Sequence, residues 1–181
     1  MTAEAGLAAL WLAAALAGLQ LLLAGLAVKR GEATLLGAVR PVAIVQGIMA
    51  LIAMGALIAV FCASDMSVAL VAENSHSAKP MLYKFAGAWG NHEGSMLLWV
   101  TILGLAGGAV ALFERRLDER TLIATLGGQA AIALGFYAFL LFASNPFGRA
   151  DPAPPDGAGL NPLLQDPGLA FHPPTLYIGY V

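Results

Sequence analysis

The chain has 181 residues, of which 59% are hydrophobic and only 11% are charged, and its net charge is −2. Because soluble domains average about 25% charged residues, this composition indicates an integral membrane protein, and the slightly acidic balance argues against a nucleic-acid partner. The single cysteine, Cys62, excludes an internal disulfide and any metal site that needs several cysteines, and no C-x-x-C-H motif marks a c-type cytochrome.

Four charge-free intervals are long enough to cross a bilayer, which takes about 20 residues. They are 5–28, 41–64, 94–113 and 121–143, and a fifth apolar segment begins near residue 173 and reaches Val181. The expected fold is all-α, a polytopic bundle of transmembrane helices with four full spans and the start of a fifth. Because the last segment is too short to span, we interpret residues 1–181 as one membrane domain, the N-terminal part of a larger protein.

Basic residues predict how the spans are oriented. The loops after the first and third spans hold most of them, namely Lys29, Arg30, Arg40, Arg115, Arg116 and Arg120. The positive-inside rule makes these loops cytoplasmic, so the N-terminus and the outer loops, 65–93 and 144–172, face the periplasm of a Gram-negative cell. We therefore expect a multi-pass protein of the bacterial inner (cytoplasmic) membrane. All three histidines, His76, His92 and His172, fall on its outer side.

Polar groups are scarce within the predicted spans. Gln20 and Gln46 are the polar side chains expected deep in the membrane, where we predict that they bond to neighbouring helices. No Asp, Glu, Lys or Arg falls mid-span. Since ion-coupled transporters and proton pumps normally need such a residue, this pattern argues against those classes.

The segment around His172 predicts a ligand site. Asp166-Pro167-Gly168 is a strong turn signal, and Pro173 and Pro174 directly follow the histidine. Because a proline disfavours the α region for the residue before it, we expect His172 to be extended, with a helix beginning at Pro173 or Pro174. An imidazole held there can bind a metal or a heme iron. The alternative is an interfacial histidine that caps a helix or bonds a loop carbonyl.

Two outer segments together resemble a known family. Residues 89–99, W-G-N-H-E-G-S-M-L-L-W, and residues 161–174, N-P-L-L-Q-D-P-G-L-A-F-H-P-P, are similar in content and order to motifs of the CcmF family. CcmF proteins are the heme lyase subunits of bacterial System I cytochrome c maturation, and residues 71–75 also fit the second loop of that family. The NrfE paralogues share these motifs, and CcmC belongs to the same heme-handling group.

The resemblance implies a function in cytochrome c-type biogenesis. Such a protein would bind heme b and present it for covalent attachment to apocytochrome c at the outer face. The implied partners are the heme chaperone CcmE, CcmH- and CcmI-type subunits, apocytochrome c and membrane lipid. The Trp-rich heme loop and the family's other heme-ligating histidines would lie beyond Val181. Residues 1–181 are therefore expected to hold at most part of a heme lyase site and not to be catalytic alone.

The resemblance also assigns candidate heme-binding residues. His172 matches the first of the family's two outer histidines, so it is the candidate axial ligand to heme iron. His92 and Trp89 are further candidates, through contact with a propionate or by stacking. Their alternatives are a structural hydrogen bond, in which Glu93 orients the His92 ring, and an aromatic anchor at the membrane interface. We expect His76 to be solvated. Two other functions stay open: a heme carrier that loads a chaperone, and a structural subunit.

Overall fold

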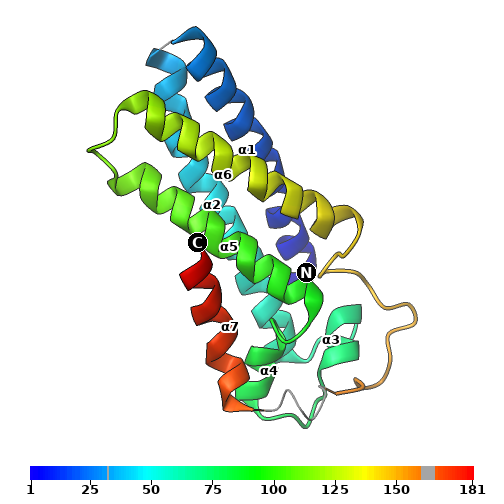
Figure 1. The fold of residues 1–181 in the computed structure, drawn as a ribbon. Helices are drawn as coiled ribbons and strands as arrows, with labels where there is room; N and C mark the ends of the chain where they lie inside the picture. The colour runs from blue at the N-terminus through cyan, green and yellow to red at the C-terminus, as the bar shows by residue number, and fades with distance from the viewer. Residues whose placement is uncertain (32, 160–165) are drawn as a thin grey trace.

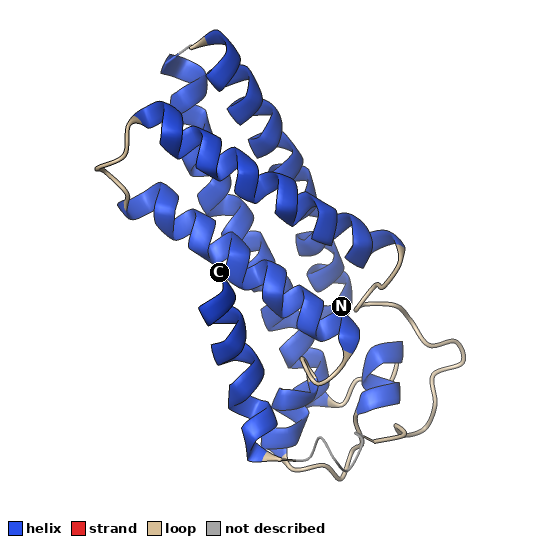
Figure 2. Cartoon of the chain, viewed as in Figure 1, coloured by secondary structure: helices blue, strands red, loops and turns tan. Residues whose placement is uncertain are grey.

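The computed structural model describes residues 1–31, 33–159 and 166–181, and every regular element in these ranges is an α-helix (Figures 1 and 2). The helices are α1 (Thr2–Arg30), α2 (Ala33–Ala63), α3 (Ala69–Asn74), α4 (Met81–Gly87), α5 (His92–Phe113), α6 (Glu119–Phe142) and α7 (Pro167–Tyr180). Four helical segments are long and apolar enough to cross a membrane: α1, residues 37–63 of α2, α5 and α6. The predicted all-α membrane fold is thus confirmed.

The four long helices form a bundle in which small residues allow close packing. Helix α1 lies against α2 and α6, and α2 also packs on α5. At Gly47 of α2, an added Cβ would stand 2.7 Å from the carbonyl oxygen of Gly104 in α5, so the two backbones touch. Such contacts are how membrane helices associate when burial of apolar surface cannot drive them together.

The two buried glutamines bond to neighbouring helices, as predicted. Gln20 of α1 donates to the carbonyl oxygen of Leu126 at 2.8 Å and to Gln129 Oε1 at 2.9 Å, both on α6. Gln46 of α2 donates to the Tyr137 hydroxyl, also on α6. Because an unpaired amide in hydrocarbon is costly, these bonds fix how α1 and α2 sit against α6.

The helices start earlier than the charge pattern predicted. Helix α2 begins at Ala33 and so includes Arg40, which we expected in the loop, and carries Pro41, the expected first residue of the span, in its interior. Arg40 is accommodated because its guanidinium donates to the carbonyl oxygens of Ala111 at 3.1 Å and Glu114 at 3.2 Å, at the end of α5. A charged residue therefore does not end this helix.

One end of the bundle carries the N-terminus, α3, α4 and the segment that follows α6 (Figure 1). The α1–α2 and α5–α6 connections lie at the opposite end. This arrangement agrees with the predicted grouping of the outer loops. The compartment that each end faces stays a prediction from the basic residues.

The two outer loops fold together into what we call the outer cap, residues 65–91 and 144–159. Backbone bonds join them: Ala69 N to Gly148 O, Ala150 N to Ser67 O, Ala158 N to Ala72 O and Gly159 N to Ser75 O, at 2.7 to 3.0 Å. Leu70 and Val71 of α3 are buried beneath. The outer cap is therefore a packed unit in which loops far apart in sequence hold each other.

Helix α7 corrects the expected geometry around His172. The helix begins at Pro167, with Asp166 as N-cap accepting from the Gly168 amide at 2.5 Å, so His172 lies within it and is not extended. The steric preference of a residue before proline is outweighed here by this strong start signal and by packing on α4 and α5, where Ala170 is buried. The N-P-L-L-Q part of the motif, residues 161–165, lies outside the described residues.

Candidate functional site

His172 lies on the exposed side of α7, near the end of the bundle that carries the outer cap. Ala170 and Tyr177 pack on the core, whereas the side chains of Phe171 and His172 are exposed. Thr175 Oγ1 donates to the backbone carbonyl oxygens of Phe171 at 3.0 Å and His172 at 2.9 Å, but no group among the described residues bonds the imidazole. The ring nitrogens are thus available to a ligand.

His92 is the first residue of α5 and is held by the end of α6. Its exposed ring meets the Phe139 ring edge-on, with centroids 5.6 Å apart, and its Nδ1 lies 3.4 Å from Ser144 Oγ. Ser144 Oγ donates its one proton to Glu93 Oε1 at 3.1 Å. If the Ser144 contact is a hydrogen bond, Nδ1 must then be the donor, which leaves the lone pair on Nε2 for an external partner. Glu93 therefore acts on His92 through Ser144.

Trp89 is buried at 5% exposure, with its ring edge-on to Phe85 at 4.7 Å between centroids. An interface anchor would expose its ring to lipid, so that interpretation is wrong. The ring instead belongs to the buried hydrophobic core and packs on Phe85 of α4.

The turn before α5 explains other residues of the 89–99 motif. The Asn91 side chain caps α5 by accepting from the Gly94 amide at 2.7 Å. An added Cβ at Gly94 would stand only 1.7 Å from the carbonyl oxygen of Ala88, so no larger residue fits. The motif thus forms a tight turn that places His92 at the N-terminus of α5.

His76 and Ser77 both contact Asp156, and we call this group of contacts between the two outer loops the clasp. The ring of His76 is exposed, as predicted, with Nε2 3.4 Å from Asp156 Oδ2 and Nδ1 accepting from the Ala78 amide at 3.2 Å. Asp156 also accepts from the Ser77 hydroxyl at 2.5 Å and the Ser77 amide at 2.9 Å. These Ser77 bonds hold the pKa of Asp156 at about 2. Both nitrogens of His76 therefore have partners within the protein.

Two basic residues of the outer cap, Arg149 and Lys79, also bond to groups within the protein. Arg149 pairs with Glu4 of α1 and bonds Ser67 Oγ, which ties the cap to the bundle. Lys79 donates to the carbonyl oxygen of Asn74 at 3.0 Å, and burial, followed by repulsion from Lys84, lowers its pKa to about 8. Arg149 is thus a structural residue that joins the outer cap to α1.

The structure gathers the three histidines at one end of the bundle but not into one cluster. Within the described ranges, no group of three or more histidine, cysteine or acidic side chains is arranged to hold a metal ion. Each candidate would therefore contribute a single ligand. Phe139, Ser144 and Asp156 were not predicted, because their partners are distant in sequence. For Ser144, the sequence contains one indication that it could lie near His92. Ser144 directly follows the fourth predicted span and His92 lies just before the third, so both fall at the outer ends of spans.

These features define a class of protein: a polytopic helical membrane protein that carries histidines at one end of its bundle. Comparison with known proteins identifies the family within this class. A family model described as Cytochrome C assembly protein matches residues 89–181, a range that begins at Trp89 and includes His92 and His172.

Individual relatives match the whole chain. It is 49% identical to the cytochrome c-type biogenesis protein ccl1 of Rhodobacter capsulatus, 47% to CcmF of Pseudomonas aeruginosa and 41% to NrfE of Haemophilus influenzae. A solved structure of the cytochrome c heme lyase CcmF is 26% identical and superposes with a TM-score of 0.86 over 99% of the chain. The chain spans 28% of the length of each of these proteins.

The chain therefore belongs to the cytochrome c assembly protein family and is a CcmF-type sequence. The resemblance drawn from residues 89–99 and 161–174 is confirmed. Both CcmF and NrfE relatives align along its full length, so the match covers both groups.

Proposed function

We propose that this chain is part of a heme-handling subunit for cytochrome c-type biogenesis. The subunit would hold heme b at the periplasmic face of the inner membrane and present it for covalent attachment to apocytochrome c. The observation that carries the proposal is the exposed imidazole of His172, which has no bonding partner among the described residues. The 49% identical relative from Rhodobacter capsulatus is named a cytochrome c-type biogenesis protein, which agrees with this role.

The residues around His172 fit a heme. A neutral imidazole is a normal axial ligand to heme iron. Phe171, 66% exposed, and Leu176, 43% exposed, flank it on α7 and offer apolar surface to a porphyrin. His92, through Nε2, is a second polar group at the same end of the bundle. This donor set suits an iron porphyrin better than a free metal ion, which would require several protein ligands.

Heme, when bound, would supply two vinyl groups, and each cysteine thiol of the apocytochrome would add its S–H across one vinyl C=C to give a thioether. The part of this chain is positioning: His172 would hold the iron and so fix where the vinyl groups point. Holding both reactants in place makes a bimolecular addition nearly unimolecular, and well-oriented reactions gain up to about 7–11 kcal/mol in this way. The remaining heme contacts would come from other parts of the whole protein. CcmE and the CcmH- and CcmI-type subunits would bind that whole protein as partners.

A matched pair of histidine variants tests the proposal in the whole gene product. His172→Ala should reduce holocytochrome c at least tenfold, because the iron ligand is lost while the helix remains. His76→Ala removes an imidazole that is committed to the clasp and should leave yield near wild type. Heme-stained cytochrome c and the amount of inserted protein are measured together. Normal cytochrome c with His172→Ala would refute the assignment, and a purified protein without a Soret band would favour a structural subunit.

A further inference from the structure

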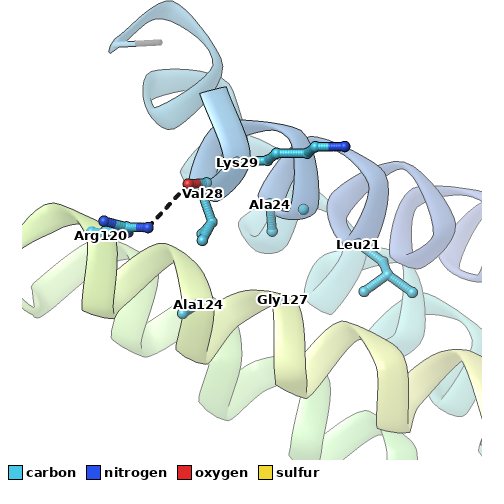
Figure 3. Close-up of a pocket in the computed structure, with 8 residues that line it drawn as sticks. Leu21, Ala24, Val28, Lys29, Arg120, Ala124 and Gly127 are labelled. Atoms are coloured by element: carbon cyan, nitrogen blue, oxygen red, sulfur yellow. Dashed lines mark hydrogen bonds between the residues drawn. The ribbon is translucent and has the colours of Figure 1, made fainter. Parts of the chain in front are cut away.

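A groove of about 410 Å³ opens between α1 and α6 at the end of the bundle opposite the outer cap (Figure 3). Its floor is apolar, with Ala24, Gly25, Ala124 and Gly127, and its rim is basic, with Lys29 and Arg120. An added Cβ at Gly127 would stand 2.8 Å from Ala24 Cβ, so the floor is the contact between the two helices. This volume lies in the range of small-molecule sites, about 300–1,000 Å³.

The rim of the groove is positively charged. Figure 3 shows the Arg120 guanidinium reaching from α6 to the Val28 carbonyl oxygen, with a donor–acceptor distance of 3.4 Å. That bond uses one of five N–H donors, so the group can still receive an anion. Lys29 stands on α1 at the same rim. A second hollow of about 240 Å³ continues over Lys29 and Arg120 to Arg30.

Nearby negative groups do not cancel this charge. The C-terminal end of α1 carries partial negative charge, but Lys29 and Arg30 occupy its last turn and offset it. Asp118 caps α6, and its Oδ2 accepts from the Thr121 amide at 2.9 Å. The exposed Glu119 is not part of the groove. The groove therefore combines two cations with a hydrocarbon-like floor.

We propose that this groove binds an anionic phospholipid, with the phosphate on the Arg120 guanidinium, Lys29 adding positive charge along the same rim, and an acyl chain along Gly25 and Ala124. Both walls are helices long and apolar enough to span a membrane, so acyl chains would lie against them in a bilayer. A free phosphate would gain nothing from the apolar floor, and a neutral lipid would gain little from the two cations. The charge of the rim thus selects the headgroup, independently of any role in heme handling.

Native mass spectrometry of the whole gene product in neutral detergent tests the site. Titration with phosphatidylglycerol should show tighter binding than titration with phosphatidylcholine. Lys29→Gln and Arg120→Gln should each weaken phosphatidylglycerol binding about fivefold, the value of ~1 kcal/mol per basic residue near an anionic membrane surface. Gly25→Leu should weaken it with both cations intact, because a Cβ at Gly25 points into open space and the longer side chain fills the groove.

Two matched variants control for charge and bulk. Arg116→Gln removes an exposed cation at the same end, and Gly128→Leu adds bulk at an exposed glycine of α6 outside the groove. Both should bind lipid like wild type, and all variants should keep the helical circular dichroism of wild type. Equal affinity for phosphatidylcholine, unchanged binding in the groove variants, displacement by free glycerol phosphate, or a groove covered by another protein segment would each overturn the proposal.

Discussion

Gly94→Ala should be the most damaging single-methyl change at the turn before α5. The added Cβ would lie 1.7 Å from the carbonyl oxygen of Ala88, where ordinary carbon–oxygen contacts are about 3.3 Å or longer. The obstacle is backbone and cannot rotate away, so the two segments must separate by more than about 1 Å. That movement would also pull the Gly94 amide off the Asn91 cap.

The expected cost is the sum of two familiar effects. Forcing atoms into a packed site costs about 1–3 kcal/mol, and losing a helix cap costs about 1 kcal/mol, so destabilisation of about 2–4 kcal/mol is expected. The matched control is Gly128→Ala on α6, where an added Cβ meets nothing within 4 Å. This control should be neutral or stabilising by up to about 1 kcal/mol, because alanine favours a helix.

Thermal unfolding of the detergent-purified protein, followed by circular dichroism, measures both variants. Cytochrome c yield should also fall with Gly94→Ala although His92 itself is intact, since the turn that places His92 has moved. A Gly94→Ala protein as stable as wild type would show that the turn is not packed as described, and the structural account of the 89–99 motif would then be wrong.

Two further predictions concern the pH dependence of the outer cap. The hydroxyl and amide of Ser77 lower the pKa of Asp156 from 3.8 to about 2, so this carboxylate stabilises the fold above pH 3.8 and stops doing so as the pH falls toward 2. Asp156→Asn should therefore lower the unfolding temperature at pH 5, and the difference from wild type should shrink near pH 2; a constant difference would contradict this. Burial lowers the pKa of Lys79 from 10.5 to about 8, so its charged amine destabilises the cap below pH 8, and that cost is relieved as the pH rises toward 10.5. Because Lys79 is partly exposed the effect is small, and Lys79→Met should flatten the rise in unfolding temperature between pH 7 and 10.

The spans could be predicted because a bilayer imposes a simple rule on sequence. A helix that crosses hydrocarbon must be apolar for about 20 residues, and the four charge-free intervals meet that condition. Helix ends were harder to place. Arg40 continues α2 because the end of α5 supplies acceptors for its guanidinium, and sequence alone does not reveal those acceptors.

The surroundings of the histidines depend on contacts between distant residues. Asp156 reaches Ser77 across 79 positions, and Ser144 reaches His92 across 52. Local pattern indicated where the histidines lie relative to the spans, but not which of them are bonded. The error at α7 had the same origin: preference at the residue before Pro173 was local, whereas the packing of Ala170 and Tyr177 was not.

The three histidines differ in how much of their bonding capacity the fold consumes. His76 has both ring nitrogens engaged, by Asp156 and by a backbone amide. His92 has one, toward Ser144, and the imidazole of His172 has none within the described residues. A ligand that must compete with existing bonds binds less tightly, so the same imidazole chemistry should rank His172 first, His92 second and His76 last as a heme ligand. The outer cap engages both ring nitrogens of His76 and, through Ser144, one ring nitrogen of His92, so that α7 presents the imidazole with the most bonding capacity left among the described residues.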